Sequence, residues 1–177
     1  MKKILLLSLV VCMVLSCKST HDFKFEKLTY HTSACFGRCP TYHMEISADK
    51  KIRLHSETAF HKRDASPDAS AVGYFTGTVN DTTFNKLLLQ LRTVGLDTVK
   101  FGGPDCCDGP VKTIIIYYNG KRKYLHAMFP PDHALPLIAT LNGIYSTSKF
   151  VKSAQPFEIE RDSIPRAAFT SSPKHQE

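Results

Sequence analysis

Four cysteines in two clusters are the residues of this sequence best suited to chemistry. They are Cys35 and Cys39, separated by Phe-Gly-Arg, and the adjacent pair Cys106 and Cys107. Paired thiols can form structural disulfides, exchange electrons as a catalytic dithiol, or bind a metal ion as thiolates. Because four cysteines allow three pairings, the sequence alone leaves the disulfide connectivity open.

A disulfide between the two clusters is the pairing that we favour. It would close a loop of about seventy residues, worth about 4.4 kcal/mol in the chain-entropy model, against about 2 kcal/mol for the short loop from Cys35 to Cys39. A bridge between the adjacent Cys106 and Cys107 would be strained. We therefore expect at least one bridge between the clusters, which would hold two loops of one domain face to face.

Zinc binding and thiol redox chemistry are the alternatives for the same cysteines. The spacing differs from that of common zinc knuckles, because three residues separate Cys35 from Cys39 and none separates Cys106 from Cys107. Catalytic dithiols usually have two intervening residues at a helix N-terminus, whereas a strand is predicted to follow this pair. We predict neither metal nor cofactor, and keep a thiol-redox or metal-handling role as the alternative function.

The other candidate side chains have simpler explanations. His31, His43 and His55 could meet across neighbouring strands, but on a polar face, which is more typical of a solvated surface than of a metal site. Asp105 and Asp108 flank the cysteine pair, yet aspartates beside Gly-Pro commonly form turns. The sequence contains no nucleophile elbow, zinc-protease helix motif or phosphate-binding glycine loop, so we predict no catalytic residues.

The N-terminus has the layout of a lipoprotein signal peptide. Two lysines precede an apolar run, residues 4–15, which is too short to span a membrane because a spanning helix needs about 20 residues. The run ends Val-Leu-Ser-Cys17, which resembles a bacterial lipobox. We predict that residues 1–16 are removed and that Cys17 is lipidated and palmitoylated, with residues 17–22 as a tether. The alternative is an ordinary secretory signal with an incidental cysteine.

These expectations define where the domain would work. Lipidation would anchor the protein in the cell envelope, and Lys18 after the lipidated cysteine favours the outer membrane. The chain carries 23 basic and 16 acidic residues, for a net charge of +7; loss of the two lysines in residues 1–16 leaves +5. This modest charge is scattered, and an exported location argues against a nucleic-acid partner. An envelope protein, a lipid or a glycan is the expected partner.

Hydrophobic periodicity predicts the elements that position these residues. Alternation predicts a first strand, a hairpin after Pro40, a further strand, and a second hairpin whose turn is Asn119-Gly120. Apolar residues at helical spacing predict two helices, the first capped at Asn80 or Asp81 and ended by Gly95, the second capped by Asp132. We therefore predict one α+β domain over residues 23–150, with a small antiparallel sheet and both helices on one face. Residues 151–177 lack periodicity and are predicted to form a poorly ordered polar tail.

The first cysteine cluster also carries a family resemblance. The motif Cys-Phe-Gly-Arg-Cys-Pro-x-Tyr, residues 35–42, resembles the signature of a bacterial domain of unknown function found in exported proteins and lipoproteins. The resemblance singles out a loop made of Phe36, Gly37, Arg38, Pro40 and Tyr42, and an aspartate ahead of the later hairpin at Asp105. It implies a small α+β domain and no enzyme activity. The pair Cys106 and Cys107 departs from the family pattern.

We therefore predict an envelope-anchored lipoprotein that acts as a non-catalytic binding or structural module. The alternative is a thiol-redox or metal-handling lipoprotein that uses Cys35, Cys39, Cys106 and Cys107.

Overall fold

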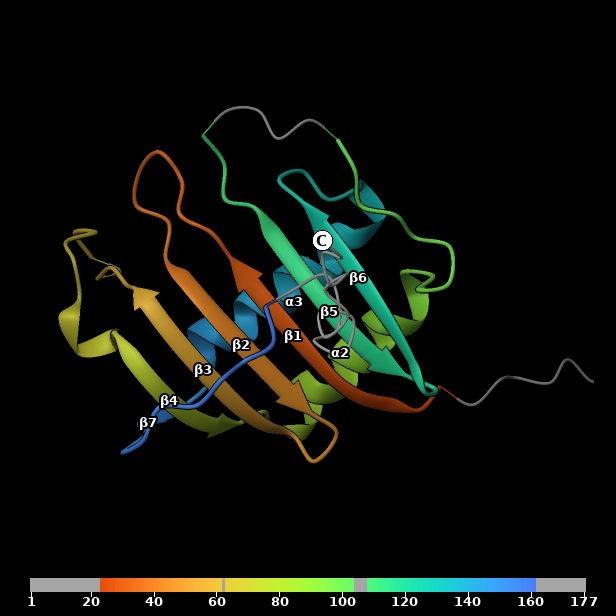
Figure 1. Ribbon diagram of the computed structural model, residues 1–177, viewed down its shortest axis with the longest axis horizontal. Helices are drawn as coiled ribbons and strands as arrows, with labels where there is room; N and C mark the ends of the chain where they lie inside the picture. The colour runs from red at the N-terminus through yellow and green to blue at the C-terminus, as the bar shows by residue number, and fades with distance from the viewer. Residues whose placement is uncertain (1–22, 62, 104–107, 162–177) are drawn as a thin grey trace, which may run out of the picture.

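Alternating apolar and polar residues fold this chain into one antiparallel sheet with two different faces. The computed structural model describes residues 23–61, 63–103 and 108–161. Over these residues the sheet has seven strands in the order β6-β5-β1-β2-β3-β4-β7, and helices cover its far face in Figure 1. The strands are β1 (Phe25–Thr32), β2 (Thr41–Ser47), β3 (Lys51–Thr58), β4 (Gly73–Thr78), β5 (Lys112–Tyr118), β6 (Lys121–Ala127) and β7 (Phe150–Lys152). The helices are α2 (Asp81–Thr93) and α3 (Leu135–Thr147), with short 3-10 turns η1 (Ala69–Ala71) and η2 (Asp132–Ala134). The predicted α+β class is confirmed.

The face under the helices is the hydrophobic core. The strand register aligns Leu28 of β1 with Ile46 of β2 and Ile116 of β5, and all three side chains are fully buried. Helix α2 covers them with Phe84, Leu87 and Leu91, and α3 adds Leu137, Ile138, Leu141 and Ile144. Burying each such side chain is worth about 1.5–3 kcal/mol, so this layer dominates the stability of the fold.

Local signals set most element ends. The side chain of Asn80 accepts a hydrogen bond from the Thr83 amide at the start of α2, and Gly95 has the left-handed φ of +71° just beyond the end of that helix. Asn119 and Gly120 both have positive φ in the tight turn between β5 and β6. The cap expected at Asp132 is wrong. That residue begins the 3-10 turn η2, and α3 starts at Leu135 without a side-chain cap.

The predicted poorly ordered tail is wrong for its first part. Val151 and Lys152, the first two residues of that tail, lie in β7, which pairs antiparallel with β4 at the edge of the sheet. Residues 153–161, named the C-terminal strap here, then cross the face of the sheet opposite the helices (Figure 1). The strap has no hydrophobic periodicity, because it docks through single side chains rather than through a repeating face. Residues 162–177 lie outside the described part of the chain.

Candidate functional site

The loop that carries Cys35 and Cys39 lies against the segment that follows the second cysteine cluster. The Phe36 amide donates to the Asp108 carbonyl over 3.2 Å, and the Ser33 amide donates to the Val111 carbonyl over 3.0 Å. The Val111 amide in turn donates to the Ser33 hydroxyl over 2.9 Å. The two loops therefore face each other as predicted, although Asp105, Cys106 and Cys107 lie outside the described residues.

The preferred disulfide between the clusters is wrong. Cys35 is bonded to Cys39, with their Cα atoms 5.6 Å apart, so neither sulfur can bridge to the second cluster or act as a free thiol. A tight turn at Gly37, whose φ is +152° and whose amide donates to the Cys35 carbonyl, brings the two cysteines together. The chain-entropy argument favours the longer loop because it compares only the entropy that each disulfide removes from the unfolded chain. It does not consider which sulfurs the native turn brings side by side.

The remaining motif residues divide into structural and exposed positions. Tyr42 is buried, stacks on Tyr145 with ring centroids 3.8 Å apart, and donates a hydrogen bond to the Asn142 side chain. The Pro40 carbonyl accepts a hydrogen bond from the Thr32 hydroxyl, and Arg38 donates to a backbone carbonyl across the neighbouring loop. Phe36 differs from them, because its side chain is 88% exposed.

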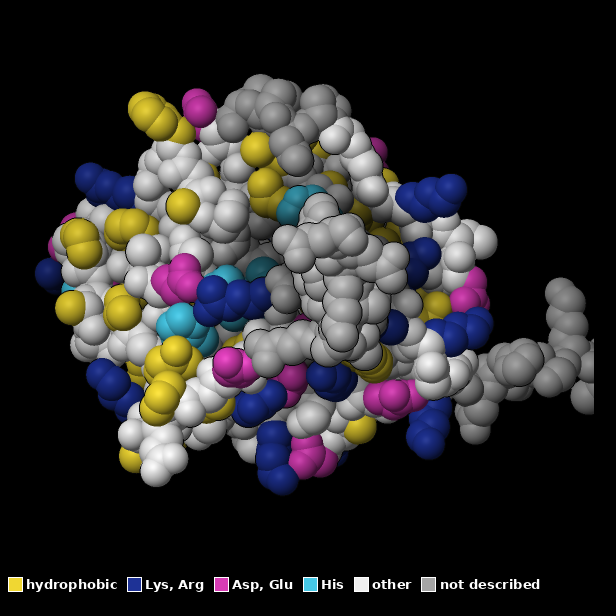
Figure 2. Space-filling model, viewed as in Figure 1, with side chains coloured by type: hydrophobic (Ala, Val, Ile, Leu, Met, Phe, Trp, Pro, Cys, Tyr) yellow, Lys and Arg dark blue, Asp and Glu magenta, His cyan; other side chains and the backbone are white. Residues whose placement is uncertain are grey.

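A row of aromatic side chains crosses the polar face of the sheet. The strand register places His31 of β1 beside His43 of β2, His43 beside His55 of β3, and His55 beside Tyr74 of β4. The Nδ1 atoms of His31 and His43 are 2.7 Å apart, and the ring of His55 stacks on Tyr74 with centroids separated by 4.2 Å. Figure 2 shows histidines gathered on this face beside basic and acidic side chains. The solvated surface predicted for this row is wrong for His31 and His43, which are only 7% and 9% exposed.

Burial keeps these histidines neutral. Burial, with the nearby His43 as the next cause, lowers the pKa of His31 to about 4. Burial also lowers the pKa of His43 and of His55, and the Arg161 guanidinium contributes to both shifts. A single proton can lie between the two Nδ1 atoms, so one ring donates and the other accepts. Neutral imidazole is the form that binds metal ions.

A carboxylate, that of Glu57, and a guanidinium, that of Arg161, lie beside His43 and His55. The Nε2 atom of His43 lies 3.0 Å from Oε1 of Glu57, and Nδ1 of His55 lies 4.0 Å from the same oxygen. One ligand atom from each of His43, His55 and Glu57 falls within 4.8 Å of the others. Arg161, at the end of the strap, donates to Glu57 over 3.1 Å and to Nδ1 of His55 over 2.8 Å. Sequence analysis missed Glu57 and Arg161, although alternation along the strand places Glu57 on the same face as His55.

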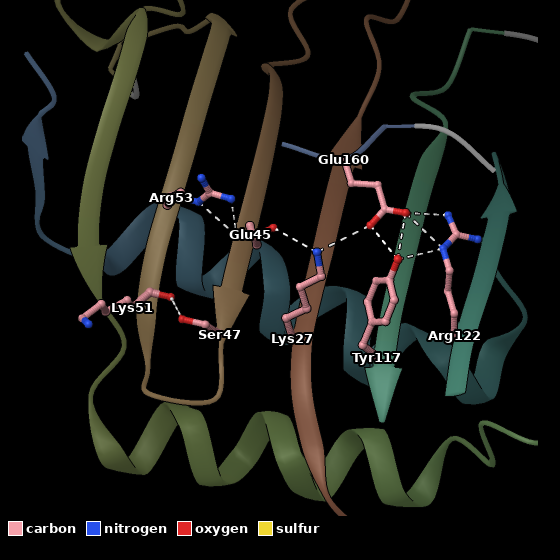
Figure 3. A network of polar contacts seen from close by, with 8 residues as sticks. All are labelled: Lys27, Glu45, Ser47, Lys51, Arg53, Tyr117, Arg122 and Glu160. Carbon is pink, nitrogen blue, oxygen red and sulfur yellow. Dashed lines mark hydrogen bonds and ion pairs between the residues drawn. The ribbon is translucent and has the colours of Figure 1, made fainter. Parts of the chain in front are cut away.

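The strap is held on this face by a second set of polar contacts, drawn in Figure 3. The carboxylate of Glu160 accepts hydrogen bonds from the Tyr117 hydroxyl and from two nitrogens of Arg122, all within 3.0 Å. Lys27 lies 3.6 Å from both Glu160 and Glu45, so the contacts continue across β1 to β2. Burial alone would raise the pKa of Glu160, but these hydrogen bonds lower it overall. The strap is therefore fixed by a paired, partly buried charge.

An apolar pocket of about 390 Å³ lies away from the histidine row, between the connection from β3 to β4 and the end of α3. Its lining includes Phe60, Phe75 and Phe150, and His61 lies 3.5 Å from Asp68 at its wall. The pocket has no residue in common with the histidine row.

Comparisons with known proteins give a family and no activity. A family model described as a domain of unknown function, DUF6438, matches residues 26–136. None of the curated proteins matches the chain. Among the described residues, neither helix has the length and apolar character needed to cross a membrane.

Proposed function

The chain belongs to the DUF6438 family, a domain of unknown function. We propose that this protein is a lipid-anchored module of the cell envelope that binds a partner and catalyses no reaction. The anchor would be a lipidated Cys17 at the end of the lipobox-like sequence, and Lys18 after it favours the outer membrane. The binding surface would be the loop closed by Cys35 and Cys39.

The observation that carries this proposal is the exposure of Phe36 on a loop that cannot easily rearrange. The side chain is 88% exposed, the disulfide closes the loop on both sides of it, and its own amide is bonded to Asp108. Large aromatic side chains supply much of the energy of protein interfaces. A loop already fixed before binding loses little conformational entropy on association, which favours affinity.

The path of the chain favours a partner away from the anchoring membrane. Phe25 lies only eight positions after Cys17, so the lipid would hold the start of β1 within about 27 Å of the bilayer. The loop follows the opposite end of β1, a strand of eight residues that is about 26 Å long. When the strand points away from the membrane, the loop is at the far end of the domain, where a protein or glycan of the envelope can reach it.

Metabolic labelling tests the anchor. With a palmitate analogue, we expect the full chain to be labelled and to sediment with membranes, and Cys17→Ala to lose both properties. Labelling that persists in the variant, or is absent from the unaltered protein, would refute the anchor.

Site-specific photocrosslinking tests the binding surface. We expect a photoreactive phenylalanine at position 36 to give a discrete crosslinked product in intact cells. The same group in place of Leu89, another exposed apolar side chain on the outer side of α2, should give none. Equal products at both positions, or none at position 36, would remove the support for a binding loop.

A further inference from the structure

A separate site lies on the polar face. We propose that His43, His55 and Glu57 bind one divalent transition-metal ion, with zinc as the best fit, and that Arg161 takes the place of the cation when no metal is bound. This site is independent of the Cys35–Cys39 loop and of the lipid anchor, so it stands or falls separately from the proposed function.

The distances match what zinc requires after small adjustments. Zinc binds imidazole nitrogens and carboxylate oxygens at about 2.0–2.2 Å in a tetrahedral arrangement, which sets neighbouring ligand atoms about 3.4 Å apart. The two ligand distances to Oε1 of Glu57, 3.0 Å from His43 and 4.0 Å from His55, lie on either side of that value. The ligands come from adjacent paired strands, β2 and β3, so the sheet already fixes their backbones.

The type of ligand also selects the class of metal. Two neutral imidazoles and one carboxylate suit zinc and its transition-metal neighbours, whereas calcium and magnesium prefer sites made only of oxygen atoms. Three protein ligands leave a fourth position for water or for a small ligand.

His31 would act as the positioning residue behind this site. Histidine ligands usually bond a second group through the ring nitrogen that does not face the metal, and His43 does so through its Nδ1 atom 2.7 Å from His31. Without metal, Nε2 of His43 donates to Glu57, so Nδ1 of His43 accepts from His31. The Nε2 atom of His31 is then left without a proton, and this buried atom makes no hydrogen bond of standard geometry in the described part of the chain, although the backbone of Glu160 lies close to the ring. When a metal binds Nε2 of His43, the proton of that ring must lie on Nδ1, so His43 donates to Nδ1 of His31. The proton of the His31 ring then lies on its Nε2 atom, which can donate it.

Arg161 already occupies the position that a cation would take. Its guanidinium donates to Nδ1 of His55 and to Oε1 of Glu57, which are the lone pairs that a metal would use. The side chains of Arg161 and Glu57 are 49% and 38% exposed, so solvent and ions can reach them. Glu160 holds the strap through separate partners, so Arg161 can leave the site while the strap stays docked.

Zinc titration of the full chain, purified in detergent and stripped with a chelator, tests the proposal. We expect one ion per chain by calorimetry, and a tetrahedral absorption spectrum when cobalt replaces zinc. Arg161→Gln removes the competing cation and should tighten zinc binding about tenfold, since a hydrogen bond to a charged group is worth about that factor. His55→Ala and Glu57→Gln should weaken it at least tenfold. The matched control is His133→Ala, which removes an exposed histidine outside the site.

Zinc should also raise the melting temperature of the unaltered protein and of Arg161→Gln, and should raise that of Glu57→Gln by less at the same zinc concentration. Melting curves of all four variants without zinc show that each is folded. All the changes are made at side chains with some exposure to solvent rather than at the buried His31 and His43. The proposal is wrong if neither the unaltered protein nor Arg161→Gln binds zinc saturably. It is also wrong if His55→Ala and Glu57→Gln bind as tightly as the His133→Ala control.

Discussion

Both faces of this sheet bury side chains of the strands, but they do so by different means. Under the helices, Leu28 and its neighbours are buried by apolar side chains that α2 and α3 supply in bulk. The polar face also buries side chains, but these carry polar groups: Thr29, His31, His43 and Glu45. Each buried polar atom there either has a specific hydrogen-bond partner or remains unpaired. The helix-covered face therefore determines that the chain folds, whereas the polar face depends on a few exact contacts. Binding sites are commonly built from such contacts, because a site must hold polar groups in fixed positions.

The largest expected effect is on the helix-covered face. Leu28→Ala removes a fully buried side chain and leaves a cavity, so we expect a loss of about 2–5 kcal/mol in the free energy of unfolding. Urea denaturation of the full chain measures this loss. A loss below about 1 kcal/mol would mean that the core repacks around the missing side chain. The helix-covered face would then contribute no more to stability at this position than the polar face does.

This contrast also explains how far the sequence could predict the structure. The stripe of Phe84, Leu87 and Leu91 and the turn at Asn119 follow from periodicity and local backbone preference, and both were predicted. Burial of the histidine row was not predicted, although its three members were expected to meet across strands. Its burial depends on neighbours that only the folded sheet and the strap bring together, and no local signal in residues 153–161 indicates that the strap docks there.

The cysteines show the same limit at the candidate binding loop. Residue types and spacing predicted a disulfide, but the choice of partner depended on a tight turn at Gly37 that the spacing of the cysteines does not specify. Loop entropy describes the unfolded chain, so it could not identify the sulfurs that are adjacent in the native state.

A smaller effect should follow when the strap loses its main charge. Glu160→Gln keeps the size of the side chain but weakens its hydrogen bonds with Tyr117 and Arg122, so we expect a loss of about 1–2 kcal/mol, reduced by partial exposure to solvent. Amide exchange of residues 153–161 should become faster. The control is Lys51→Gln, whose ion pair with Asp49 is fully exposed and should contribute much less to stability than the contacts of Glu160. Equal losses in both variants would show that the strap is not held by this charge.

The contribution of Glu160 should depend on pH with a definite sign. Its pKa in the folded protein is lowered from the ordinary value of 4.5, so below that value the unfolded chain binds the proton more readily. The stabilisation is therefore complete above pH 4.5 and is lost as the pH falls through the lowered pKa. We expect the difference in unfolding free energy between the unaltered protein and Glu160→Gln to be constant near neutral pH and to shrink below about pH 4.5. The other carboxylates cancel in this difference, so a gap that widens in acid would contradict the assignment.

The smallest expected effect, and one of opposite sign, concerns the residue next to Leu28. Thr29 points to the polar face, is fully buried, and its hydroxyl has no hydrogen-bond partner in the described part of the chain. Thr29→Val keeps the branched shape and removes the unpaired hydroxyl, so we expect unchanged stability or a gain of up to about 1 kcal/mol by urea denaturation. A clear loss would mean that the hydroxyl has a partner, such as a bound water. In that case even the Thr29 hydroxyl would stabilise the fold through a hydrogen bond. Every buried polar group of β1 would then depend on a partner, in contrast to the apolar side chains on the other face of the same strand.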